Sequence, residues 1–250
     1  MIYVTNTPNN AGVAIYGDYL DFEALYDALH TVVGDEEEEP ALAAAGLRVL
    51  AVCYDLRHAL MGHRDIEFVD NGMDADKMRQ MAVIASSKNV YFKINVLWPE
   101  MLFVMVALND FVKLYARKQA KTTDEIMLNR RNIWDDSIAQ VRMLQAAVAK
   151  CLKSVVSAGV YSRMMGSLNK KYIMYYNYAT QYVDLLNCRF LKMDKEKRLQ
   201  NLSKIAKLLT EPGSEYLDLR NEILQAAQEY NCPIEDIRIN DVEYPDHIDW

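Results

Sequence analysis

The sequence predicts a mainly helical α+β fold, in which a small antiparallel sheet of about four strands near the N-terminus packs on helices. Period-two alternation of apolar and polar residues, which is typical of half-buried strands, falls within the first hundred residues. Helical apolar spacing dominates elsewhere and predicts a helical C-terminal half with a long central helix. Because 51% of the 250 residues are hydrophobic, the chain can bury a sizeable core.

Two pairs of segments have strand patterns. Residues 2–5 and 13–16 alternate, and the turn-forming residues between them predict a hairpin. Residues 64–69 and 89–97 alternate as well and predict a second pair. The connection 70–88 has 19 residues, which is long for a structureless loop, so we expect it to be partly helical, mobile or functional.

Three helices are predicted in the first half of the chain. Asp21 is the expected N-cap of the first, which Gly34 ends. Pro40 opens the second, which runs to Gly62 and is apolar on two sides, as expected of a helix between layers. The third helix covers residues 99–118.

A long central helix is predicted over residues 123–158. Its apolar residues repeat with the spacing of a coiled-coil seam, interrupted by Gln145. Two interpretations stay open, because the seam could pack within the chain or against a second copy. The residues expected at such an interface are Trp134, Ile138, Val141, Val148 and Leu152.

Tyrosines mark the next predicted helix, which follows Gly159. Tyr172, Tyr175 and Tyr176 are expected at the edge of the core or in a subunit interface, and stacking on nucleic-acid bases is the alternative. Two further helices and an acidic, extended tail complete the chain. For domains, we expect an α+β domain at 1–120, a helical region at 121–232 and the tail at 233–250, or one single domain.

The net charge of −7 conceals three blocks of opposite sign. Residues 1–76 carry 15 acidic and 3 basic side chains, residues 77–210 carry 9 acidic and 23 basic, and residues 211–250 carry 11 acidic and 2 basic. The basic block could attract nucleic acid, but its charges are spread along helices, so we expect such binding to be weak and salt-sensitive. The acidic ends could instead fold back against the basic middle.

Several classes of protein lack support in the sequence. The four cysteines lie far apart without a CxxC pair, which is typical of a reduced, cytoplasmic compartment. The longest apolar run, Met101 to Leu108, is too short to cross a membrane, so no membrane partner is expected. Nucleotide-binding and calcium-binding motifs are missing, and we predict no cofactor.

The densest group of polar residues that could carry chemistry is Asp55, Arg57, His58 and His63. Asp55 and His58 are neighbours on a helix surface, which is the least that an oriented general base requires. In the structural interpretation, His58 is hydrogen-bonded between layers and Arg48 forms a salt bridge with Asp55. No nucleophile motif accompanies the group, and the spacing of His58 and His63 does not predict a metal site.

Three parts of the first 115 residues carry a resemblance to other proteins. They are Asn6–Asn10 with Gly17–Asp18, Cys53–His58 with Gly62–Phe68, and Asn89–Tyr91 with Leu97–Glu100. Over residues 1–115 the chain resembles a group of uncharacterised bacterial proteins of unknown function. The resemblance implies a bacterial, cytoplasmic origin and supplies no activity.

The leading functional hypothesis is a non-enzymatic interaction or regulatory module that forms a homo-oligomer through its helical half. It depends on the apolar seam, the tyrosines, the charged blocks and the missing catalytic motifs. A hydrolase-like enzyme that uses the Asp55 and His58 group is one alternative. Nucleic-acid binding through residues 113–207 is another, and a different protein partner is a third.

Overall fold

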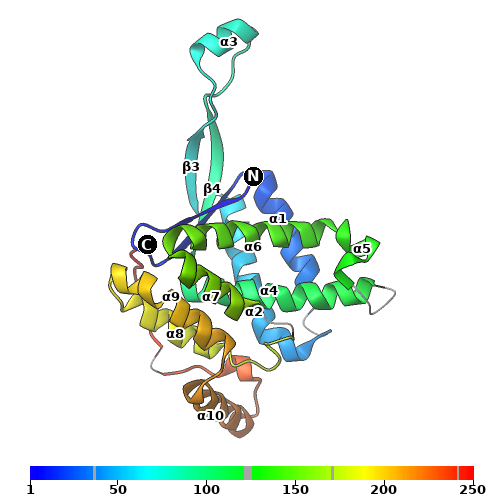
Figure 1. The fold of residues 1–250 in the computed structure, drawn as a ribbon, viewed down its shortest axis with the longest axis vertical. Helices are drawn as coiled ribbons and strands as arrows, with labels where there is room; N and C mark the ends of the chain where they lie inside the picture. The colour runs from blue at the N-terminus through cyan, green and yellow to red at the C-terminus, as the bar shows by residue number, and fades with distance from the viewer. Residues whose placement is uncertain (36–37, 121–125, 170–171, 241) are drawn as a thin grey trace.

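The computed structural model describes residues 1–35, 38–120, 126–169, 172–240 and 242–250. An antiparallel sheet with the strand order β1-β2-β4-β3 lies in the N-terminal half and packs on helices (Figure 1). The predicted fold class is therefore confirmed. The strands are β1 (Tyr3–Asn6), β2 (Gly12–Gly17), β3 (Asp65–Asp70) and β4 (Lys88–Leu97).

Helices form most of the rest of the described chain. The α-helices are α1 (Tyr19–Val33), α2 (Ala43–Leu60), α3 (Ala75–Met81), α4 (Trp98–Gln119), α5 (Arg130–Ile133), α6 (Asp136–Val155), α7 (Ala158–Leu168), α8 (Gln181–Leu191), α9 (Lys195–Thr210) and α10 (Ser214–Tyr230). Short 3-10 helices cover Pro40–Leu42, Ile126–Leu128 and Ile234–Asp236.

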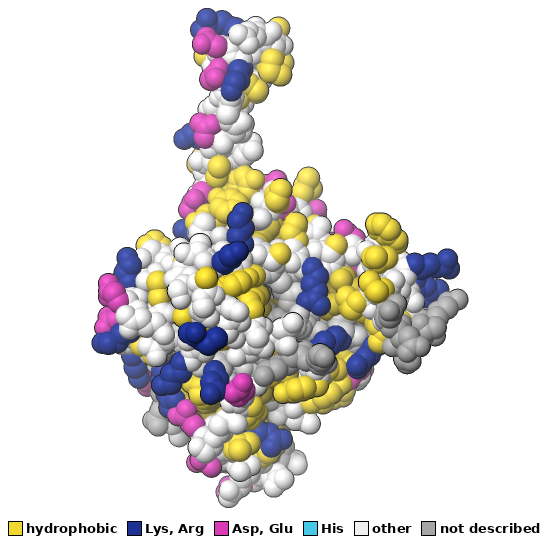
Figure 2. Space-filling model, in the orientation of Figure 1, with side chains coloured by type: hydrophobic (Ala, Val, Ile, Leu, Met, Phe, Trp, Pro, Cys, Tyr) yellow, Lys and Arg dark blue, Asp and Glu magenta, His cyan; other side chains and the backbone are white. Residues whose placement is uncertain are grey.

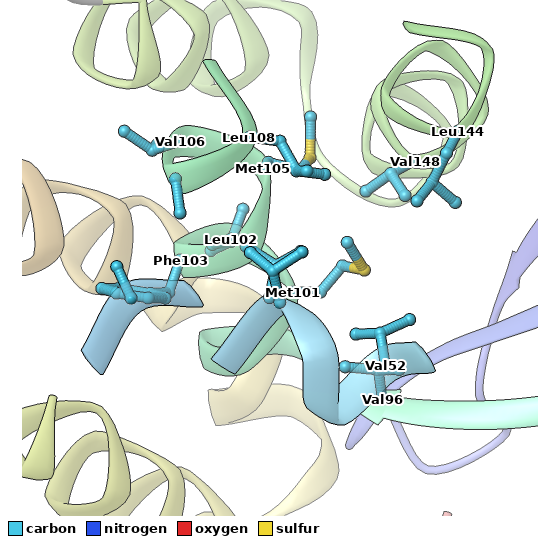
Figure 3. Packing of buried hydrophobic residues seen from close by; sticks show 14 of the residues in the cluster. Val52, Val96, Met101, Leu102, Phe103, Met105, Val106, Leu108, Leu144 and Val148 are labelled. Atoms are coloured by element: carbon cyan, nitrogen blue, oxygen red, sulfur yellow. The ribbon is translucent and has the colours of Figure 1, made fainter. Parts of the chain in front are cut away.

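The centre of the core is α4, which is buried along most of its length. Helices α1, α2, α6, α8 and α9 pack around it. On one side, Leu144 and Val148 of α6 face Met105 and Leu108 of α4 (Figure 3). Helix α6 also packs on α1 and β1, so one continuous hydrophobic core joins residues from the N-terminal and C-terminal halves.

The register of the sheet gives it one apolar face toward this core. Val13 of β2 lies opposite Val96 of β4, and Ile15 lies opposite Ile94. All four side chains are buried. Gly12 begins β2 because a Cβ atom there would lie 2.0 Å from the Val96 carbonyl oxygen.

A two-stranded arm leaves the body of the protein. Strand β2 ends opposite Phe92, whereas β3 pairs with β4 outward to Asp70 and Lys88. The ribbon carries α3 at its far end (Figure 1), so the connection 70–88 is partly helical, as predicted. We call residues 66–91 the arm.

The predicted long central helix is wrong in its first part. Helix α6 begins only at Asp136, where the Asp135 carboxylate accepts a hydrogen bond from the Ile138 N–H at 2.9 Å. Asn132 is buried and donates to the backbone oxygens of Ala116 and Ile126, which fixes a tight turn before α6. Trp134 lies in this turn, and residues 123–125 lie outside the described part.

The predicted tyrosine-rich helix is also wrong, because residues 172–180 are not helical. The buried Asp110 carboxylate accepts the N–H groups of Met174 and Tyr175 at 2.8 and 3.3 Å. Asn177 has the left-handed φ of 51° and donates its N–H to Ala41. These N–H groups therefore donate to acceptors elsewhere in the fold, and not to the carbonyl groups of a helix.

Smaller differences concern the first helix and the tail. Asp18, not Asp21, is the N-cap of α1, and the two form a reciprocal capping box with bonds of 2.9 and 3.0 Å. The tail returns to the body, where the Asn9 N–H donates to the Trp250 carbonyl at 3.1 Å. In the part of the chain that the structure describes, no helix is both long and apolar enough to span a membrane.

Candidate functional site

The apolar face of the sheet continues along the arm after the covering helices end. Ile94 is buried, and Phe92 is half-buried against Phe22, with ring centroids 6.2 Å apart. Farther out, Val90 lies opposite Phe68, and Phe68 is 66% exposed. The same strand face is therefore core at the root of the arm and bare surface beyond it.

The tip of the arm is ordered by local polar contacts without a core of its own. Asp74 caps α3 by accepting the N–H groups of Asp76 and Lys77 at 3.0 and 2.8 Å. No residue of α3 is buried. Large apolar side chains are exposed there and where the arm leaves the body (Figure 2), and those of the arm are Ile66, Phe68, Met81, Val83, Ile84 and Val90.

A second exposed apolar patch lies at the root of the arm. Tyr19 and Leu20 begin α1, two to three residues before Phe22, and Leu20 is 72% exposed. The acidic residues Glu23 and Asp27 are exposed on the same helix. Each chain thus presents an apolar arm and, at its root, an apolar patch next to negative charge.

The free edge of the arm is acidic. Strand β3 is the last strand of the sheet and carries Asp65, Glu67 and Asp70. Lys93 of β4 lies 3.6 Å from Asp65 and 3.4 Å from Glu67. Carboxylates along an open edge disfavour the addition of another strand from a second copy of the same chain, because the like charges would be brought together.

The predicted polar cluster is only partly brought together. The Asp55 carboxylate accepts two hydrogen bonds from Arg64, at 2.7 and 3.1 Å, and no bond from His58 to Asp55 is found among the described residues. His58 instead packs on Tyr54, and its Nδ1 lies 3.4 Å from Nδ1 of His63.

The surroundings of this cluster are open. Arg57 is exposed and His58 is half-buried. The structural interpretation expected a hydrogen bond of His58 between layers, whereas its polar neighbour is the exposed His63. No group of three or more His, Cys, Asp or Glu residues in the described ranges is placed to hold a metal ion.

Arg48 does not pair with Asp55. It forms a bidentate contact with Asp184 and donates to Glu100 at 3.2 Å and to the Thr180 carbonyl at 3.0 Å. Burial lowers the pKa of Arg48, but Glu100 and Asp184 outweigh this effect, and the pKa is raised. Sequence reasoning missed both partners because they lie 52 and 136 residues from Arg48.

The predicted interface residues divide into two groups. Ile138, Val141, Val148 and Leu152 are buried within the chain, as is Tyr175, whose ring stacks on Phe103 at 4.4 Å. Trp134, Tyr172 and Tyr176 are exposed, Trp134 by 83%. The seam of α6 therefore packs inside a single chain, and only the second group remains free to meet another molecule.

The comparison with curated proteins and the comparison with solved structures give no match. One family, described as a domain of unknown function (DUF6904), matches residues 2–250. The resemblance predicted for the first 115 residues therefore extends over nearly the whole chain. On this match, the chain belongs to the DUF6904 family.

Proposed function

We propose that the protein is a non-enzymatic interaction module that self-associates through its arm, with the arms of two copies packed face to face in antiparallel order. The observation that carries the proposal is the apolar face of β3 and β4, which runs out of the core and stays uncovered. This proposal moves the self-association expected of the helical half to a different surface, because the α6 seam is already covered.

The energetics of the arm favour a partner. A two-stranded ribbon is marginally stable in water, and a helix as short as α3 gains little from its own hydrogen bonds. At about 150–200 Å² for a large side chain, the six apolar side chains of the arm expose on the order of 600 Å². A standard interface buries roughly 800 Å² per partner, so the arm and its root patch are large enough for one.

A second copy is the occupant that fits both ends of the surface. In a two-fold interface the same patch serves on both chains, so antiparallel arms bring the tip of each to the root of the other. The tip exposes Met81 and Ile84, and its cations Lys77 and Arg79 lie in ion pairs with acidic residues of the same tip. The root offers Tyr19 and Leu20 beside acidic residues of α1. In this order, exposed apolar side chains meet at both ends of the interface.

Shortening the arm tests the proposal directly. Residues 71–87 are replaced by Asn-Gly, which joins Asp70 to Lys88 through a two-residue hairpin turn and leaves the body intact. We expect the parent protein to sediment as a dimer in analytical ultracentrifugation and the shortened variant as a monomer. The far-UV circular dichroism spectrum of the variant should show that the body is still folded.

The matched control changes the exposed aromatic residues of the helical half. The Trp134→Ser, Tyr176→Ser double variant should remain dimeric, because both side chains are exposed and neither belongs to the arm or to the patch at its root. A monomeric parent, or a shortened variant that stays dimeric while this control becomes monomeric, would contradict the proposal.

A further inference from the structure

Three residues that line one cavity each carry an unpaired, buried acceptor. In the described part of the chain, buried side-chain atoms without a hydrogen-bond partner include Asn95 Oδ1, Glu100 Oε1 and Asn187 Oδ1. All three residues line the same cavity of about 190 Å³, between α2, β4, the first turn of α4, α8 and the tail. Buried acceptors are rarely left unpaired in a folded protein, so the presence of three of them around one cavity points to a ligand that donates hydrogen bonds.

The neighbouring hydrogen bonds fix which atoms are free. Glu100 Oε2 already accepts from Arg48 at 3.2 Å and from Asn187 Nδ2 at 2.8 Å. Asn187 is 1% exposed, and its amide nitrogen also donates to the Tyr244 hydroxyl at 3.0 Å. Because the amide nitrogen must face the Glu100 carboxylate, Asn187 Oδ1 is the atom left without a donor.

The charges around the cavity leave room for one cation. Arg48 is neutralised by Asp184 and Glu100, and Arg64 is neutralised by Asp55. Three carboxylates thus face two guanidinium groups. Burial raises the pKa of Glu100, and the contacts with Arg48 and Asn187 offset this only in part, as expected of a carboxylate that lacks a further positive partner.

The three unpaired acceptors and the cavity lining indicate which class of ligand would fit. Three acceptors require three donors, and a primary ammonium group has three N–H donors whereas water has two. Beside Arg48, Asp55 and Tyr244, the lining also includes apolar residues that suit a short alkyl stem, among them Val52, Leu97, Ile248 and Trp250. The face of an indole ring also attracts a cation.

We propose that this cavity binds a small primary amine in its ammonium form, held by Asn95, Glu100 and Asn187. A wider groove of about 630 Å³ shares Asp55, Asn95 and Trp250 with the cavity and provides the path of entry. The site is separate from the arm and does not depend on self-association.

Calorimetric titration of the full-length protein with n-propylammonium chloride tests the site, with sodium chloride at equal ionic strength as the blank. We expect saturable binding, and none of the neutral analogue n-propanol. Glu100→Gln keeps the shape of the side chain but removes the charge, and should weaken binding about 10–100-fold. Glu38→Gln, which removes a charge from an exposed pair with Lys118, should leave binding unchanged.

A second variant guards against misfolding of the first. Asn95→Val suits a β-strand, removes an acceptor, and should weaken binding as well. Equal binding of propanol and propylammonium would overturn the proposal. So would parent-like binding by both Glu100→Gln and Asn95→Val, or a crystal structure soaked with the amine that holds only water at the three oxygen atoms.

Discussion

Helix α6 and the arm each present a continuous apolar face, but only α6 has that face covered by its own chain. Ile138, Val141, Val148 and Leu152 of α6 lie against α1, α4 and β1. On the arm, Phe68 and Val90 have the same alternation as the buried part of the sheet and no covering helix. Apolar periodicity therefore indicates that a face will be covered, and leaves open which chain covers it.

The largest expected effect is a loss of folding stability when the covered face of α6 is changed. Replacing both Ile138 and Leu152 by Ala should lower the free energy of unfolding by about 4–10 kcal/mol, because each change leaves a cavity in a core that cannot close around it. Urea denaturation of the variant and the parent measures the difference. A loss under about 1 kcal/mol, nearer to the cost of a surface substitution, would mean that the seam is not part of the core.

The matching change on the arm should act on association instead. Phe68→Ser removes the most exposed aromatic side chain of the two strands, and should weaken the dimer about 10-fold or more, by the cost of a buried interface residue. The unfolding free energy of the monomer should change little. Sedimentation equilibrium gives the dimer constant, and Leu217→Ser, at an exposed position of α10, is the control. If both variants weaken the dimer equally, the arm is not its interface.

This contrast also explains what the sequence could predict. The strand pairs and most helices follow from local periodicity and were found within a few residues of their observed ends. The tyrosine segment failed because Asp110, more than sixty residues earlier, takes the N–H groups of Met174 and Tyr175. No local pattern encodes such a bond, so helical spacing alone could not exclude it.

The candidate site was predictable in part for the same reason. The length of the 70–88 connection marked the arm as unusual, although nothing in it indicated that the ribbon would leave the body. Asp55 and His58 are neighbours on α2, but Arg64 from the following strand region takes the carboxylate. The cavity at Glu100 joins four separate segments, and only the tertiary structure brings them together.

A smaller effect is expected on the pH dependence of folding stability, at single buried tyrosines. Burial raises the pKa of Tyr175 and of Tyr178 well above 10, so both keep their protons in the folded state while the unfolded chain loses them. The folded state then binds more protons above pH ~10, and stability should fall there by about 1.4 kcal/mol per pH unit for each tyrosine.

Tyr175→Phe tests this dependence. The variant cannot ionise at this position, so its stability should fall less steeply than that of the parent above pH ~10, by one tyrosine's share of the slope. At pH 8 (a chosen assay condition) the change should stay within about 1 kcal/mol, because the hydrogen bond lost is the long 3.4 Å contact with the Leu209 carbonyl. Identical slopes for parent and variant would place Tyr175 outside the core.

The smallest effect is expected at His58, a half-buried residue near the C-terminal end of α2. Its ring lies on Tyr54, and its nearest polar partner, Nδ1 of His63, belongs to an exposed side chain. Water can replace that partner, so His58→Ala should change the unfolding free energy by no more than about 0.5 kcal/mol. Asp55→Asn removes the ion pair with Arg64 and should cost up to about 1 kcal/mol. Thermal melting of the two variants shows which change costs more stability. A loss of about 1–3 kcal/mol for His58→Ala would instead match a histidine hydrogen-bonded between layers.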